Sequence, residues 1–142
     1  MPDARTARDR AARELERGRS KEAIDLLEWA VGLDPNDADC RTLLGVVYAR
    51  TRQIERAFLQ LERAIELAPD AFAPRCALGE LYVRLAMSEE GEEHLNAALR
   101  CASSAAERGY VRSLTKQARD GGRRPLSRGS FRQPTWLMRG WR

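Results

Sequence analysis

The sequence has few of the residues that most metal, redox and membrane sites require. Only 6% of its 142 residues are aromatic, and there is a single histidine. The three cysteines stand singly, with no Cys-x-x-Cys pair, which argues against a disulfide framework and a thiolate metal site. No stretch reaches the roughly 18 consecutive apolar residues of a membrane-spanning helix. These absences exclude disulfide-scaffold, thiolate-metal and membrane-spanning classes.

Catalytic motifs are also missing. There is no phosphate-binding glycine loop, no dinucleotide glycine motif and no pair of catalytic carboxylates. His94 follows Glu90 by four residues, a spacing that suits two metal ligands, but a lone histidine among solvated glutamates is more often ordinary surface. Cys76 lacks a neighbouring histidine that would make it a nucleophile. We therefore predict a non-enzyme without cofactor or metal.

The N-terminal residues carry charges but no apolar core segment, so they do not read as a secretory signal. Together with the unpaired cysteines, this predicts a reduced, cytoplasmic setting. Arginines make up 23 of the 25 basic residues, which favours a GC-rich genome and a bacterial source.

The chain does contain a repeat. Hydrophobic residues make up 43% of it, and long Ala/Leu/Glu/Arg stretches favour helices. Leu44, Gly45 and Tyr48 recur 34 positions later as Leu-Gly-x-x-Tyr, so three copies are predicted at about 4–37, 38–71 and 72–105. Further columns at this interval are Leu27, Leu61 and Leu95; Ala30, Ala64 and Ala98; Ala23, Ala57 and Gly91; and Pro35 and Pro69.

Each copy reads as two short helices separated by a break. Apolar residues follow a spacing of three and four, and Ser20 and Ser88 are predicted N-caps of the second helix of their copies. Gly45 and Gly79 lack side chains, which lets the two helices of a copy approach closely. Such a short pair cannot bury its own apolar stripe, so copies are expected to stack into a solenoid.

The 34-residue interval and these residues resemble the tetratricopeptide repeat (TPR) family over residues 4–105. Sel1-like repeats share Leu-Gly-x-x-Tyr but usually have a longer interval. The resemblance implies an all-α, right-handed solenoid of three helix-turn-helix repeats. The first copy departs from the pattern, with Arg10, Ala11 and Glu14 in place of Leu, Gly and Tyr. Residues 106–120 are predicted to form a capping helix that completes a domain of residues 4–120.

In the TPR family, one side of the first helix of each repeat lines a concave groove that takes a partner's peptide or helix. Counting 100° per residue from the core positions identifies that side. The implied function is a protein-interaction adaptor or scaffold, although Val46 and Val83 could instead only contact the neighbouring copy. The predicted groove residues are Arg8, Thr42, Val46, Ala49, Arg50, Cys76, Glu80, Val83 and Arg84, with Arg5 and Tyr110 as possible extensions.

One TPR subclass binds C-terminal carboxylates through a Lys/Asn/Arg clamp. Arg8 and Arg84 fit part of it, but Ala12 and Ala77 replace polar members. Binding of the chaperone Glu-Glu-Val-Asp type is therefore not expected. Small apolar groups flanked by arginine and glutamate favour an amphipathic helix or an extended segment.

Residues 121–142 form a basic tail with six arginines and no acidic residue, which leaves 19 basic and 21 acidic residues, a charge of −2, in residues 1–120. Arginine interleaved with aromatic rings is chemistry that nucleic acid or an anionic membrane surface can use. This gives an alternative function, with tail contacts at Arg123, Arg124, Arg128, Arg132, Trp136, Arg139 and Trp141.

Three other interpretations remain open at this stage. The tail has no dedicated ligand, or its Pro-Thr-Trp-Leu-Met segment docks on its own solenoid or on a second copy, which would be a form of self-association. A small TPR-type secretion chaperone also fits the size of the chain.

Overall fold

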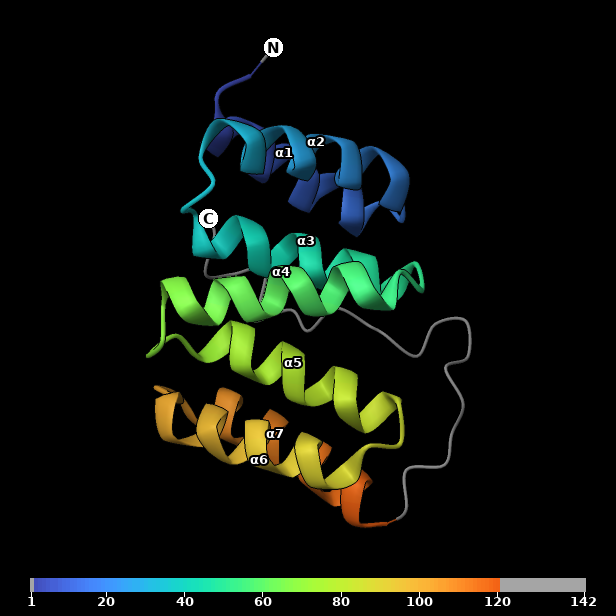
Figure 1. Ribbon diagram of the computed structural model, residues 1–142, viewed down its shortest axis with the longest axis vertical. Coiled ribbons are helices and arrows are strands. Elements are labelled where there is room, and N and C mark those ends of the chain that lie inside the picture. Colours follow the sequence, from blue (N-terminus) through green and yellow to red (C-terminus); the bar gives the residue numbers. More distant parts are fainter. Residues whose placement is uncertain (1, 121–142) are drawn as a thin grey trace.

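The computed structural model describes residues 2–120, and within this range all regular structure is helical. Helices run side by side in a stack of pairs, closed by a last unpaired helix (Figure 1). None of the helices in this range is long and apolar enough to cross a bilayer. The helices are α1 (Ala4–Glu16), α2 (Ser20–Leu33), α3 (Ala38–Arg50), α4 (Ile54–Leu67), α5 (Phe72–Arg84), α6 (Ser88–Cys101) and α7 (Ala105–Arg119).

Side-chain caps begin α1, α3 and α7 but not the second helix of any pair. Asp3, Asp37 and Ser104 each accept a hydrogen bond from a backbone N–H in the first turn of their helix. The predicted N-caps Ser20 and Ser88 are wrong by one residue, because each serine is the first helical residue. The Ser88 hydroxyl instead donates to the backbone oxygen of Ala118, at 3.2 Å, and ties α6 to α7.

The turn inside each pair has the same backbone form in all three repeats. Gly18, Arg52 and Ala86, each 34 positions apart, have φ angles of 76°, 64° and 60°. The N–H of the following residue donates to the carbonyl five positions earlier, at 2.8–2.9 Å, as in a Schellman motif. This left-handed residue reverses the chain directly into the next helix, which explains why no serine cap is needed.

The two helices of a repeat touch most closely at small residues. A Cβ placed on Gly45 would lie 2.7 Å from Cγ of Leu61, and one on Gly79 would lie 2.9 Å from Cγ of Leu95. Gly91 makes the reciprocal approach from α6, since a Cβ there would lie 2.8 Å from Cγ2 of Val83. The expected reason for the repeated glycine is thus confirmed.

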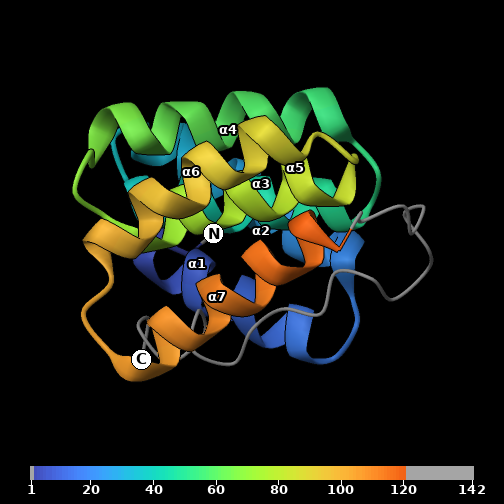
Figure 2. The ribbon, with the colours of Figure 1, turned by 90° about the horizontal axis from the view of Figure 1, so that it is seen from below.

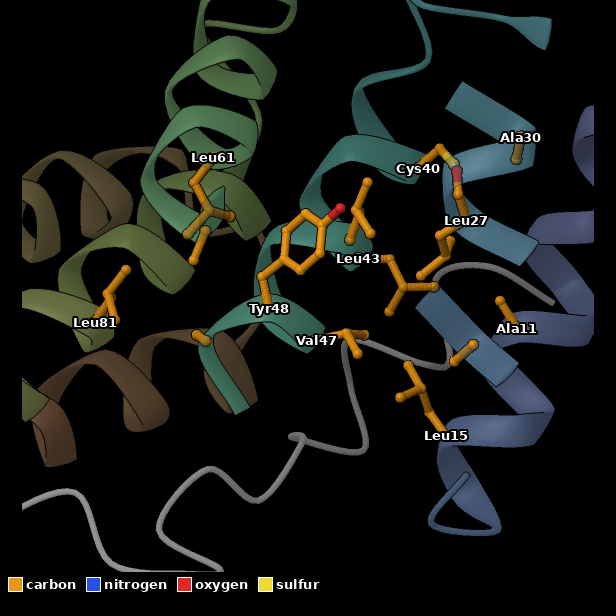
Figure 3. Close-up of a cluster of buried hydrophobic side chains, with 14 of the residues drawn as sticks. Ala11, Leu15, Leu27, Ala30, Cys40, Leu43, Val47, Tyr48, Leu61 and Leu81 are labelled. Carbon is orange, nitrogen blue, oxygen red and sulfur yellow. Dashed lines mark hydrogen bonds between the residues drawn. The ribbon is translucent and has the colours of Figure 1, made fainter. Parts of the chain in front are cut away.

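The buried side chains form two clusters along the stack. The larger joins α1 to α4 and reaches α5 through Leu78 and Leu81, while the smaller joins α5, α6 and α7. In the larger cluster, Tyr48 of α3 lies among side chains of neighbouring helices, including Leu61 of α4 (Figure 3). In the same cluster, Sγ of Cys40 points at the backbone oxygen of Leu27, 3.8 Å away. Helix α5 therefore contributes side chains to both clusters and links the second repeat to the third.

The first repeat forms despite its unusual opening helix. Ala7, Ala11 and Leu15 of α1 are buried against α2. On another side of α1, Thr6, Asp9 and Arg13 take the positions that hold Cys40, Leu43 and Val47 in α3. Those three α3 residues are fully buried, whereas Thr6 and Arg13 are exposed. The polar substitutions therefore make α1 a solvated end of the stack.

We expect Gly45→Ala to lower the free energy of unfolding by about 1–3 kcal/mol, because the added methyl overlaps Leu61 and crowds the Ala57 carbonyl. Gly109→Ala is the matched control: its Cβ meets no atom within 4 Å, so the helix propensity of alanine should stabilise α7 by up to about 1 kcal/mol. Urea unfolding followed by circular dichroism measures both. Equal stability of Gly45→Ala and wild type would contradict the close approach.

Ala86→Gly should raise the free energy of unfolding by about 0.5–1 kcal/mol, because a left-handed φ strains alanine but not glycine. Gly18→Ala should lower it by a similar amount, since space around Gly18 is open and only the backbone angle opposes the methyl. Paired thermal and urea unfolding would test this. A neutral result for both variants would show that the turns relax freely.

Candidate partner-binding face

One side of α1, α3 and α5 carries three rows of residues at the 34-residue interval. We call it the A-helix face. It lies about 100° around each helix from the glycine positions that contact the second helix of the repeat. Figure 2 shows α3 beneath α4 when the stack is seen from below. The rows are Arg8, Thr42 and Cys76; Ala12, Val46 and Glu80; and Glu16, Arg50 and Arg84.

The structure divides the predicted groove residues into two groups. Arg8, Val46, Arg50 and Arg84 are half-buried, so part of each side chain reaches the surface. The others, Thr42, Ala49, Cys76, Glu80 and Val83, are buried.

Two of the buried residues are explained by local packing. The Thr42 hydroxyl donates to the Ala38 carbonyl of its own helix at 2.8 Å, and Val83 lies against Gly91 of α6. Val46, in the middle of the central row, is therefore the partly accessible apolar residue among those predicted.

Arg8 links the first repeat to the second through ion pairs. Its Nη1 lies 3.2 Å from Oδ2 of Asp37 and 3.8 Å from Oδ2 of Asp39. The same Asp37 carboxylate accepts from the backbone N–H of Cys40 at 3.0 Å, so it also caps α3. Sequence reasoning did not find this pairing, because 29 residues separate Arg8 from Asp37 and helical periodicity does not show which residues meet between repeats.

At the other end of the face, α7 contributes Tyr110. Its hydroxyl donates to Oε2 of Glu80 at 2.7 Å, and Nη2 of Arg84 lies 3.5 Å from Oε1 of the same carboxylate. Burial raises the pKa of Glu80, although both partners act against this shift. Burial and the adjacent Glu80 also raise the pKa of Tyr110 above its usual range. This cluster joins α5 to the capping helix through a buried carboxylate.

The thiols in the core are not activated. Burial raises the pKa of Cys40 to about 12 and the pKa of Cys76 well above its usual value. Both therefore stay protonated and behave as small apolar side chains.

The remaining candidate, His94, lies on α6 and is stacked on the ring of Tyr82, with ring centroids 5.3 Å apart. Phe58 of α4 lies on Tyr82 as well, at 5.0 Å. Burial lowers the pKa of His94, which keeps the imidazole neutral near pH 7. Within residues 2–120, no three His, Cys, Asp or Glu side chains gather as metal ligands would. His94 thus packs as part of an aromatic stack between repeats.

The tail contacts predicted at Arg123, Arg124, Arg128, Arg132, Trp136, Arg139 and Trp141 lie outside the described residues.

The stacked pairs, their identical turns and their 34-residue interval define an α-solenoid repeat protein. Residues 38–71 match the family model described as Tetratricopeptide repeat. Residues 38–71 are thus similar to a tetratricopeptide repeat, and the predicted all-α TPR solenoid is confirmed. No curated protein matches the sequence.

Solved structures share this fold. The first TPR of Spaghetti (RPAP3), bound to the HSP90 peptide SRMEEVD, aligns with a TM-score of 0.71 and 17% identity, covering 80% of this chain and 91% of that one. The TPR domain of P58(IPK) aligns with a TM-score of 0.74 and 21% identity over 84% of this chain. This chain spans 33% of the P58(IPK) chain.

Replacing Tyr110 with phenylalanine should destabilise the protein by about 1–3 kcal/mol near neutral pH, because a buried carboxylate loses a hydrogen-bond donor. A carboxyl whose folded pKa is raised gains stability as the pH falls through that pKa, and losing the donor raises the pKa further. The deficit should therefore be smaller at about pH 5 than at about pH 8.

The measurement is urea unfolding at both pH values, with Tyr82→Phe as the control. Tyr82 lies in the aromatic stack and not beside Glu80. A deficit in Tyr110→Phe that does not change with pH would show that Glu80 is not the source of the effect.

Proposed function

We propose that this protein is an interaction adaptor whose A-helix face binds a peptide or helix of a partner protein. The observation that supports it most is the partial exposure of the apolar side chains in the central row of the A-helix face. Ala12 and Val46 remain only partly covered on consecutive repeats, although the helices that carry them are otherwise well packed. Partly covered apolar side chains beside polar ones offer an anchor for an apolar group of a partner.

The charged side chains around this row form ion pairs with one another. Arg8 is paired with Asp37 and Asp39, and Arg84 is paired with Glu80. A carboxylate of the partner would have to displace these pairs, which disfavours a clamp for an acidic chain end. We therefore propose a partner segment with an apolar residue over Val46 and polar groups on either side, as in an amphipathic helix or extended strand.

The RPAP3 domain supports this proposal by analogy of fold, since that domain is bound to an HSP90 peptide. The ligand chemistry need not be shared. The internal pairing of Arg8 and Arg84 favours a different sequence from the acidic one in that complex.

Val46→Glu should weaken partner binding by at least about 2 kcal/mol, about thirtyfold, because a charge would replace the apolar anchor. Leu59→Glu is the matched control, since Leu59 is 64% exposed on α4, outside the A-helix face. Wild type and both variants would be used to capture proteins from the native lysate at low and high salt. Circular dichroism would show that both variants remain helical.

A discrete protein retained by wild type and by Leu59→Glu at high salt, but lost by Val46→Glu, is the expected result. Equal retention by all three chains would remove the A-helix face as the binding surface. Retention that disappears at high salt would indicate contacts dominated by charge and contradict the apolar anchor.

A further inference from the structure

We propose, building on the binding function above, that the A-helix face has an internal ligand: the segment Pro134-Thr135-Trp136-Leu137-Met138 of the chain's own C-terminal tail. A bound tail would compete with the partner, so the protein would carry its own inhibitor. The face accepts apolar groups at Val46, and this segment is the apolar part of an otherwise basic tail. Left in water, Trp136, Leu137 and Met138 would form an exposed apolar cluster.

The end of α7, from which the tail continues, lies beside this face. Ser88 bonds to Ala118 and Arg119 pairs with Glu92, so the last turn of α7 lies against the first turns of α6. Because α6 follows α5 after a short turn, this point is also beside the C-terminal end of α5, which carries Arg84. Figure 1 shows that α1, α3, α5 and α7 all end on the same side of the stack.

The length of the tail is sufficient. Residues 121–136 are sixteen residues, which span at most about 58 Å when extended. Neighbouring packed helices are about 10 Å apart, so α3 is roughly two helix spacings from α7 along the face. Trp136 can therefore reach Val46 with slack.

Charge and tethering favour the chain's own tail over a second copy. Residues 1–120 carry −2 and residues 121–142 carry +6, so the two parts attract each other. Covalent attachment through a tail of this length gives an effective concentration near the millimolar range, above the concentration of a free second copy in a dilute solution.

The test uses the full chain with Cys101→Ser and one engineered cysteine pair, Val46→Cys with Leu137→Cys. Cys40 and Cys76 are fully buried and can stay. The control pair is Leu59→Cys with Leu137→Cys, which places a more accessible thiol on α4, so exposure alone would favour the control. We expect the Val46 pair to form an intramolecular disulfide at least tenfold faster than the control pair, as seen by non-reducing electrophoresis and mass spectrometry.

Equal rates for the two pairs would overturn the internal ligand. A covalent dimer whose yield rises with protein concentration would also overturn it and assign the segment to a second copy.

A second measurement uses a fluorescent synthetic peptide of residues 130–142 as the probe. The wild-type tail should compete with it, so the full chain carrying Trp136→Ser, Leu137→Ser and Met138→Ser should bind the peptide at least fivefold more tightly than wild type. Adding Val46→Glu to that variant should abolish the binding. Equal affinity of wild type and the triple variant would contradict self-competition.

These outcomes separate the two proposals. Loss of partner capture in Val46→Glu without preferential cross-linking would overturn only the internal ligand. The opposite outcome is also informative. If Val46→Cys cross-links preferentially and Val46→Glu captures the partner as well as wild type does, the proposed partner site is overturned and the tail contact is kept.

Discussion

The fold depends on how closely the two helices of a repeat approach each other. Gly45, Gly79 and Gly91 each face a large side chain of the partner helix, with no room for a methyl group. Such close contact lets Leu61 and Leu95 fill the space between helices and stay fully buried. Because close-packed interiors do not absorb extra volume, this spacing sets the angle and distance at which the next pair can dock. The A-helix face is a consequence of this packing.

Much of the fold could be predicted from the sequence because the repeat encodes it more than once. Leu44, Gly45 and Tyr48 recur at a fixed interval, and each recurrence tests the same structural explanation. The serine caps were mispredicted because the turns are determined by a backbone conformation. Arg52 and Ala86 adopt it as Gly18 does, and nothing in their side chains signals a left-handed residue. At these two positions the turn between the paired helices, and not the conformational preference of the residue, determines the backbone angles.

The candidate face was harder to predict for a different reason. Helical periodicity gives the direction in which a side chain leaves its helix, but not what meets it there. Val83 points toward α6, and Glu80 meets a tyrosine from a helix thirty residues further along the chain. The pairing of Arg8 with Asp37 is also long-range. Such contacts depend on superhelical geometry, so the sequence predicts the rows of the face but not which of their members stay accessible.

The pattern of contacts along the stack has a consequence for how the chain reaches this structure. The principal contacts join helices that are neighbours or next neighbours in the sequence. Chains dominated by local contacts fold quickly, because little loop-closure entropy is lost before packing begins. They also open from their ends, one unit at a time. Amide hydrogen exchange in α1 and α7 should therefore be fastest, and the long-lived protection should lie in α3 and α4.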